Sequence, residues 1–184
     1  MSANLTGGMV VSRALARYGV RTVFAVAGAS HSFLLDALER DGFEIISSRH
    51  ESGCVGAADG YARVSGRPGV AFVITGPGFT NMITPMAQAR ADSVPMLVVS
   101  GVNTLPSLGK GLGHLHELPD QQALVGLVAL RSDRVETSAD LLPALDRAFQ
   151  ACSSGRPGPA HIEVPLDVAG NTFDIVSASP RFDL

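Results

Sequence analysis

The sequence predicts an α/β fold, with a doubly wound, mostly parallel sheet of about six strands and helices on both faces. Short runs of consecutive apolar residues, as in strands that are buried on both sides, recur at 23–26, 70–74 and 96–100. Between these runs, apolar residues repeat at the three- and four-residue intervals of an amphipathic helix. Turns of small residues join the two kinds of segment. This alternation favours parallel strands connected by right-handed crossover helices.

The first half of the chain follows this alternation from its beginning. Residues 5–18 have helical spacing and end at Gly19, because glycine readily adopts the conformation that terminates a helix. Ser30 is placed to cap the helix that follows the first strand. The elements expected here are a helix at 5–18, a strand at 23–26, a helix at 31–40, and a strand followed by a helix within 45–63.

The second half continues the pattern around one long interruption. Residues 101–118 are rich in glycine and have no periodicity, so they are expected to form a loop, and loops of this length are usually functional or mobile. The elements expected here are strands at 70–74, 96–100, 134–136 and 161–164, and helices at 81–92, 119–128 and 139–151.

Composition narrows the class of protein. The 184 residues are 46% hydrophobic and 17% charged, which is typical of one globular domain with a substantial core. A net charge of −3 without a basic cluster makes neither nucleic acid nor a membrane surface an expected partner. The sequence contains no signal-peptide pattern and no apolar run of membrane-helix length. Cys54 and Cys152 fit no metal-ligand spacing, so buried reduced thiols in a cytoplasmic protein are expected.

Glu51 is the leading candidate for a functional residue. It is expected at the carboxyl end of a strand and in the first turn of a helix. Ligands bind at that edge of open parallel sheets, and the unpaired amides of a first helical turn favour a carboxylate. A glutamate at this position can also simply complement the helix dipole. Its position alone does not separate the two interpretations.

Two turns of small residues are expected at the same edge. Ala27 and Gly28 follow the first strand, and Thr75-Gly76-Pro77-Gly78 follows the strand at 70–74. Backbone amides in such turns can approach a ligand, although each turn by itself is more often a simple connection. Neither turn matches the phosphate loop or the dinucleotide-binding motif, which disfavours a nucleotide-binding domain. Together with Glu51, the turns predict a ligand site at this edge.

Histidine spacing gives no indication of a metal site. His50, His114 and His116 lie where chemistry could use them, but no pair has the spacing of ligands on one helix face. His116 and Gln121 are candidates for polar contacts to a substrate from the long loop, or else solvated loop residues. His31, His161 and the methionines are expected to be structural.

Five motifs occur in order along the chain: Arg49-His50-Glu51, Ala58–Arg63, Gly69-Val70, Thr75–Gly78 with Thr80-Asn81, and Asp92-Ser93 with Pro95-Met96. With these motifs in this order, the sequence resembles the thiamine diphosphate enzymes of the acetolactate synthase and 2-oxoacid decarboxylase family. The resemblance covers residues 5–168 and corresponds to the N-terminal, pyrimidine-binding domain of that family, so residues 1–168 are expected to form this domain and 169–184 to begin a linker or tail. Within the family, residues 109–119 are most similar to decarboxylases of 5-guanidino-2-oxopentanoate.

The resemblance implies a role for each matching residue. Glu51 would hydrogen-bond N1′ of the cofactor's aminopyrimidine and favour the imino tautomer that activates the thiazolium ring. His116 and Gln121 would face the substrate. Most relatives have proline where this chain has Ala27, which makes the contact of the first loop to the cofactor less certain. The residues expected to line or border the pyrimidine pocket are Ala27, Gly28, Gly76, Pro77, Gly78, Asn81 and Gln88.

The resemblance also implies cofactors and partners. No Gly-Asp-Gly followed by Asn occurs, so Mg²⁺ and the diphosphate are expected to be bound by a diphosphate-binding domain, in a second chain or in a segment missing here. The substrate is expected to be a small 2-oxoacid and the assembly a homodimer or tetramer. FAD use, the particular 2-oxoacid, and decarboxylase or synthase activity stay open. The alternative is a non-catalytic dimerisation or regulatory module of the same fold.

Overall fold

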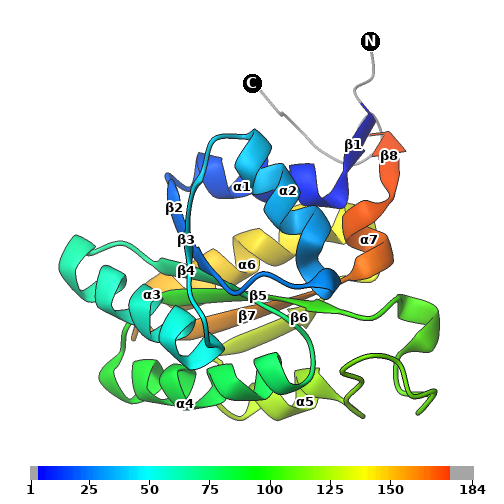
Figure 1. Ribbon diagram of the computed structural model, residues 1–184. Helices are drawn as coiled ribbons and strands as arrows, with labels where there is room; N and C mark the ends of the chain where they lie inside the picture. Colours follow the sequence, from blue (N-terminus) through cyan, green and yellow to red (C-terminus); the bar gives the residue numbers. More distant parts are fainter. Residues whose placement is uncertain (1–3, 175–184) are drawn as a thin grey trace.

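The computed structural model describes residues 4–174 and contains a central sheet of six parallel strands in the order β3-β2-β4-β5-β7-β6 (Figure 1). Every neighbouring pair in this sheet is parallel. The expected α/β class is therefore confirmed. The strands of the central sheet are β2 (Thr22–Ala25), β3 (Glu44–Ser47), β4 (Gly69–Val73), β5 (Met96–Val102), β6 (Arg131–Arg134) and β7 (Pro159–Pro165).

Helices cover both faces of the sheet (Figure 1). One face packs against α1, α2, α6 and α7, and the other against α3, α4 and α5. The helices are α1 (Gly7–Arg17), α2 (Ser32–Arg40), α3 (Glu51–Ser65), α4 (Pro77–Asp92), α5 (Gln121–Gly126), α6 (Leu141–Ser153) and α7 (Leu166–Gly170), with short 3₁₀ turns η1 (Ala29–His31), η2 (Leu105–Ser107) and η3 (Ser138–Asp140).

Strand β4 shows why continuous apolar runs became central strands. All five of its residues are buried. Val70 and Phe72 belong to the core on the α1 side, whereas Ala71 and Val73 belong to the core on the α3 side. Side chains alternate between the two faces of a strand, so a strand with helices on both sides needs apolar residues at every position.

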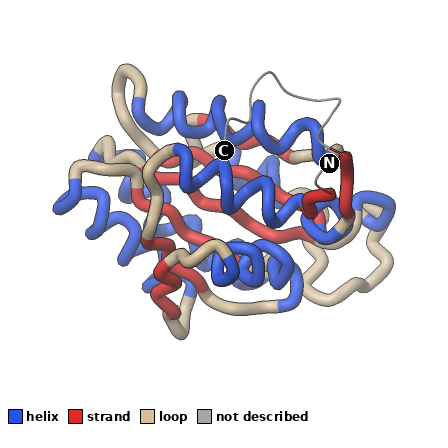
Figure 2. The backbone as a smooth tube through the Cα atoms, turned by 90° about the horizontal axis from the view of Figure 1, so that it is seen from above, coloured by secondary structure: helices blue, strands red, loops and turns tan. Residues whose placement is uncertain are grey.

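A second, two-stranded sheet was not expected from the sequence. Strand β1 (Asn4–Thr6) pairs antiparallel with β8 (Thr172–Asp174), at the periphery of the molecule near the N-terminus (Figure 2). Residues 172–174 fall in the segment expected to begin a linker, and 175–184 lie outside the described residues. The domain boundary itself stays a prediction.

Several expected elements are shifted. The helix expected at 5–18 begins at Gly7, because Leu5 and Thr6 belong to β1, and the helix expected at 119–128 is the shorter α5. The helix expected at 81–92 begins at Pro77, whose fixed φ and missing N–H suit the first helical position. The strand expected at 134–136 begins at Arg131 instead, because this half-buried outer strand is made of polar residues and carries no apolar signal. The helix expected at 139–151 is divided into η3 and α6.

Candidate functional site

The candidate site lies where β2, β3 and β4 end. Strand β3 ends at Ser47, and α3 starts at Glu51. His50 caps that helix, with its Nδ1 accepting a hydrogen bond from the backbone N–H of Ser52 at 3.2 Å. Glu51 is only 7% exposed although its side chain is polar and ionisable. A nearly buried carboxylate at a helix N-terminus is stabilised by the helix dipole but still needs hydrogen-bond partners.

One oxygen of Glu51 has such a partner within the chain. Nδ2 of Asn81, in the second turn of α4, donates to Oε2 of Glu51 at 3.0 Å. The hydroxyl of Ser52 donates to the backbone carbonyl of Asn81 at 2.7 Å, so the two helix starts are held together twice. Among residues 4–174, Oε1 of Glu51 accepts no hydrogen bond. One oxygen is therefore fixed and the other is available to a ligand.

Glycines make room around this carboxylate. A Cβ atom at Gly78 would lie 2.7 Å from Oε1 of Glu51 and 2.3 Å from Cγ1 of Ile74. A Cβ atom at Gly28 would lie 2.3 Å from Cγ2 of Ile74. Gly28 and Gly78 therefore both pack against Ile74. A side chain at position 78 would enter the space beside the Glu51 carboxylate, and a side chain at position 28 would press on Ile74.

The turn after β4 is held against the long loop. Gly76 has φ of +68°, and a Cβ atom on it would lie 2.4 Å from the backbone oxygen of His116. His116 also has a positive φ, of 59°, which is uncommon for a residue other than glycine. The hydroxyl of Thr75 reaches the same His116 oxygen at 3.4 Å. Through these contacts the loop at 103–118 is seated on the candidate site, while the His116 side chain is exposed.

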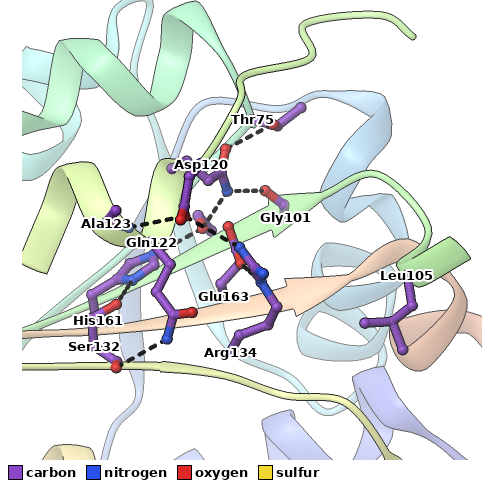
Figure 3. A network of polar contacts seen from close by, with 12 residues as sticks. Thr75, Gly101, Leu105, Asp120, Gln122, Ala123, Ser132, Arg134, His161 and Glu163 are labelled. Atoms are coloured by element: carbon purple, nitrogen blue, oxygen red, sulfur yellow. Dashed lines mark hydrogen bonds and ion pairs between the residues drawn. The ribbon is translucent and has the colours of Figure 1, made fainter. Parts of the chain in front are cut away.

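Gln121 is buried beneath this loop, with 3% of its surface exposed. Its Oε1 accepts from the Thr75 hydroxyl at 2.8 Å, and its Nε2 lies 3.3 Å from both Ser100 Oγ and the Gly101 carbonyl oxygen. Figure 3 shows this network, which runs from Thr75 down to His161 and Ser132. All the polar atoms of the Gln121 amide are thus engaged within the protein.

The network continues into the sheet. His161 lies between two hydroxyls, with Nε2 2.9 Å from Ser100 Oγ and Nδ1 2.9 Å from Ser132 Oγ (Figure 3). Burial lowers the pKa of His161 to about 3, so its ring is neutral. Beside it, Arg134 pairs with Glu163, whose pKa is raised by burial against the opposing effect of this arginine.

His31 is a second buried histidine near Glu51. Burial lowers its pKa to about 4, against smaller opposite effects of the Val26 backbone and the Glu51 carboxylate. Neither ring nitrogen makes a hydrogen bond within residues 4–174. Burying polar atoms without hydrogen-bond partners costs free energy. A group from outside the described residues could supply the hydrogen bonds that the His31 ring nitrogens lack.

The other expected site residues lie farther out. Ala27 and Pro77 are exposed, and Ala27 and Gly28 border an open hollow of about 780 Å³ beside α2 and β3. Gln88 is exposed and its Nε2 donates to Asp92 at 2.9 Å, where Arg63 also pairs with Asp92. Within the described residues, no group of three or more His, Cys, Asp or Glu side chains is arranged to hold a metal ion.

Two residues of the site were not singled out from the sequence as site residues. Thr75 stood in a recognised turn, and Ser30 was expected only as a helix cap, yet the Thr75 N–H donates to Ser30 Oγ at 3.2 Å. These residues tie the turn after β2 to the turn after β4. The pairing of residues this far apart leaves no signal in local spacing.

The chain is similar to known enzymes over most of its length. Residues 5–124 match the family model described as the thiamine pyrophosphate enzyme, N-terminal TPP binding domain. The chain is 49% identical over 164 residues to a probable 2-ketoarginine decarboxylase of Pseudomonas aeruginosa, covering 89% of this chain and 29% of that protein. It is 37% identical over 165 residues to the catalytic subunit of the mitochondrial acetolactate synthase of Saccharomyces cerevisiae, covering 89% and 24%.

A third relative is 2-hydroxyacyl-CoA lyase 2 of Caenorhabditis elegans, 38% identical over 162 residues, covering 88% of this chain and 25% of that protein. The chain thus spans between 24% and 29% of the length of these three relatives. No helix in residues 4–174 combines the length and apolar character that crossing a membrane requires. Residues 5–124 include the segments that build the candidate site, and the chain belongs to the family of thiamine pyrophosphate enzymes, as their N-terminal TPP-binding domain.

Proposed function

We propose that this chain is the pyrimidine-binding half of a thiamine diphosphate-dependent enzyme that acts on 2-oxoacids, with Glu51 as the residue that activates the cofactor. The observation that carries the proposal is the unequal state of the two Glu51 oxygens. Asn81 holds Oε2, whereas Oε1 is without a partner among the described residues and lies beside Gly78. A carboxylate held this way can accept a hydrogen bond from a ring nitrogen and share a proton with it.

The residues around Glu51 suit a flat aromatic ring. Gly28 and Gly78 carry no side chain where a Cβ would enter the site or press on Ile74. The ring nitrogens of His31 are buried and unpartnered within the described chain. Bound thiamine diphosphate supplies the electron sink that decarboxylation of a 2-oxoacid requires, and the protein supplies orientation and polarisation. In this proposal Asn81 orients Glu51, and Glu51 holds the proton at N1′.

The remaining expected residues take supporting roles. The burial of Gln121 and its bonds to Thr75 and Ser100 favour a positioning role beneath the loop that carries His116. The exposed His116 side chain is free to contact a substrate from this loop. Ala27 and Pro77 would border the cofactor, with Gln88 at the outer limit of the site.

The substrate and the assembly are inferred from the relatives. The 49% identity to a probable 2-ketoarginine decarboxylase favours a 2-oxoacid with a guanidino side chain and decarboxylation as the reaction. Since the chain spans 29% of that relative, we infer that a diphosphate-binding domain completes the site and binds Mg²⁺ there. A homodimer or tetramer in the cytoplasm is part of the same proposal. FAD stays open.

The decisive experiment is Glu51→Gln in the chain assembled with its diphosphate-binding half. Gln keeps the size of the side chain but cannot share a proton, so kcat for 2-ketoarginine is expected to fall by about 10²–10⁴-fold. Glu136→Gln, an equal change of charge at an exposed residue, should leave kcat within about twofold. Unchanged activity in Glu51→Gln would refute the proposal and favour the non-catalytic dimerisation or regulatory module.

A further inference from the structure

A separate cleft lies at the opposite end of the sheet from Glu51. Its volume is about 350 Å³, and it is bordered by residues that precede β2 and β4, by the end of α3 and by one side of α6. We call it the amino-edge cleft and define it by Tyr18, Val20, Tyr61, Arg67, Asp146 and Phe149. The five residues of β4 separate it from the candidate site, a distance of roughly 17 Å at about 3.3 Å per residue.

Aromatic rings form its walls. Tyr18 stacks on Phe149 with ring centroids 4.0 Å apart and an interplanar angle of 11°. The second wall is Tyr61, whose ring contacts Phe24 edge to face with centroids 5.9 Å apart. This contact holds the Tyr61 ring in place. The Tyr18 hydroxyl donates to Asp146, and burial together with this bond raises the pKa of Tyr18 to about 12. The tyrosine therefore stays neutral and its ring is held in place.

One charged group in the cleft has no partner. The side chain of Arg67 forms no hydrogen bond or ion pair within residues 4–174, and Arg67 is exposed two residues before β4. Asp146, by contrast, is engaged by Tyr18. A free guanidinium beside aromatic walls can bind a carboxylate with two parallel hydrogen bonds while the rest of the ligand packs on the rings. The Asp146 carboxylate would repel a second negative charge.

We propose that the amino-edge cleft is a second ligand site, for a small monocarboxylate with an aromatic body. The carboxylate binds Arg67, and the ring packs against the aromatic walls. The volume lies at the lower end of the range of small-molecule pockets, which fits a single ring with a short acidic arm. Nothing in the reaction proposed at Glu51 requires this cleft, so the site stands independently of that proposal.

The chain carries its own reporter for this site. It contains two tyrosines and no tryptophan, and both tyrosines line the cleft, so intrinsic fluorescence arises there. We would titrate the 184-residue chain with phenylacetate, with its neutral analogue phenylacetamide, and with phenethylammonium. Backbone amide NMR shifts would locate the binding: Gly19 and Ser153 should move, and Asn81 should not.

Phenylacetate is expected to bind saturably, and phenylacetamide at least about tenfold more weakly, because only the anion makes charge-assisted bonds to Arg67. Phenethylammonium should bind more weakly still. Arg67→Gln should weaken phenylacetate by about tenfold or more, whereas Lys110→Gln, the same loss of charge in the long loop, should not change it. Circular dichroism and thermal melting would verify that both variants fold.

Three results would overturn the proposal. The first is the absence of saturable phenylacetate binding up to about 10 mM. A dissociation constant above that concentration corresponds to binding weaker than about 3 kcal/mol. The second is equal binding of the acid and the amide by the parent chain, a comparison that does not depend on any variant. The third is a set of shifted amides centred on Asn81 rather than on Gly19 and Ser153.

Discussion

Nδ2 of Asn81 lies 3.0 Å from Oε2 of Glu51 and joins the first turn of α3 to the second turn of α4 at the carboxyl edge of the sheet. This bond fixes the plane of the carboxyl group and leaves Oε1 facing Gly78. The two residues come from consecutive strand–helix units, so the right-handed crossover of the fold brings them together. The geometry at Glu51 therefore depends on how α4 is positioned as well as on α3.

Replacement of Asn81 by Ala should loosen Glu51 without removing it. The carboxylate loses its hydrogen-bond donor within the chain, so it is no longer held in one orientation. In the assembled enzyme we expect kcat to fall by about tenfold, as lost orientation costs less than lost proton transfer. Steady-state kinetics would measure this. Asn103→Ala serves as control, because it removes a different amide hydrogen bond, the one from Asn103 to the backbone oxygen of Leu115. An Asn81→Ala enzyme with parental kcat would contradict the orienting role.

Replacement of Gly78 by Ala should place a methyl group where the site has no room. That methyl would lie 2.3 Å from Ile74 and 2.7 Å from the Glu51 carboxylate, so one of them must move. Overpacking of this kind costs about 1–3 kcal/mol. Urea unfolding of Gly78→Ala should show that loss, whereas Gly60→Ala, on α3 with nothing within 4 Å, should gain about 0.5–1 kcal/mol because alanine favours a helix. Equal effects at the two glycines would contradict the close packing at Gly78.

The fold could be predicted from the sequence because its central strands are buried on both faces. β4 and β5 are apolar at nearly every position, and such runs indicate a covered parallel sheet. β6 was misplaced because Arg131–Arg134 is an outer strand of polar residues. β1 and β8 were missed because three-residue strands have no measurable periodicity. Their pairing is a long-range contact that local pattern does not encode.

The candidate site could be predicted only in part. Its place in the strand–helix pattern marked Glu51 as a candidate, but that place alone did not separate a ligand-binding carboxylate from one that complements the helix dipole. Its contact with Asn81, and the bonds from Thr75 to Gln121 and Ser30, depend on crossover geometry and not on spacing. Buried polar networks of this kind are set by tertiary packing, so they became visible only in the structure.

The ion pair between Arg134 and Glu163 is expected to matter asymmetrically. The Glu163 side chain is fully buried, whereas that of Arg134 is 26% exposed (Figure 3). Arg134→Gln leaves a buried carboxylate without its partner and should cost about 3–5 kcal/mol of unfolding free energy. Glu163→Gln leaves an arginine that can reach solvent and Asp120, so it should cost less. The double variant should recover part of the loss. Urea unfolding near neutral pH would test this order, and a double variant that is as unstable as Arg134→Gln would contradict it.

Stability should fall as the solution is made acidic, because the fold buries two neutral histidines. The pKa values of His31 and His161 are lowered from 6.5 to about 4 and about 3, so below pH 6.5 the unfolded chain binds more protons than the folded one. Each histidine then contributes a loss of up to about 1.4 kcal/mol per pH unit, while the raised pKa of Glu163 acts in the opposite direction. Replacement of His31 by Leu removes one of these groups and breaks no hydrogen bond within the described residues. The variant should be at least as stable as the parent at pH 7 and lose less stability towards pH 4, and parallel curves of unfolding free energy against pH would contradict a buried neutral His31.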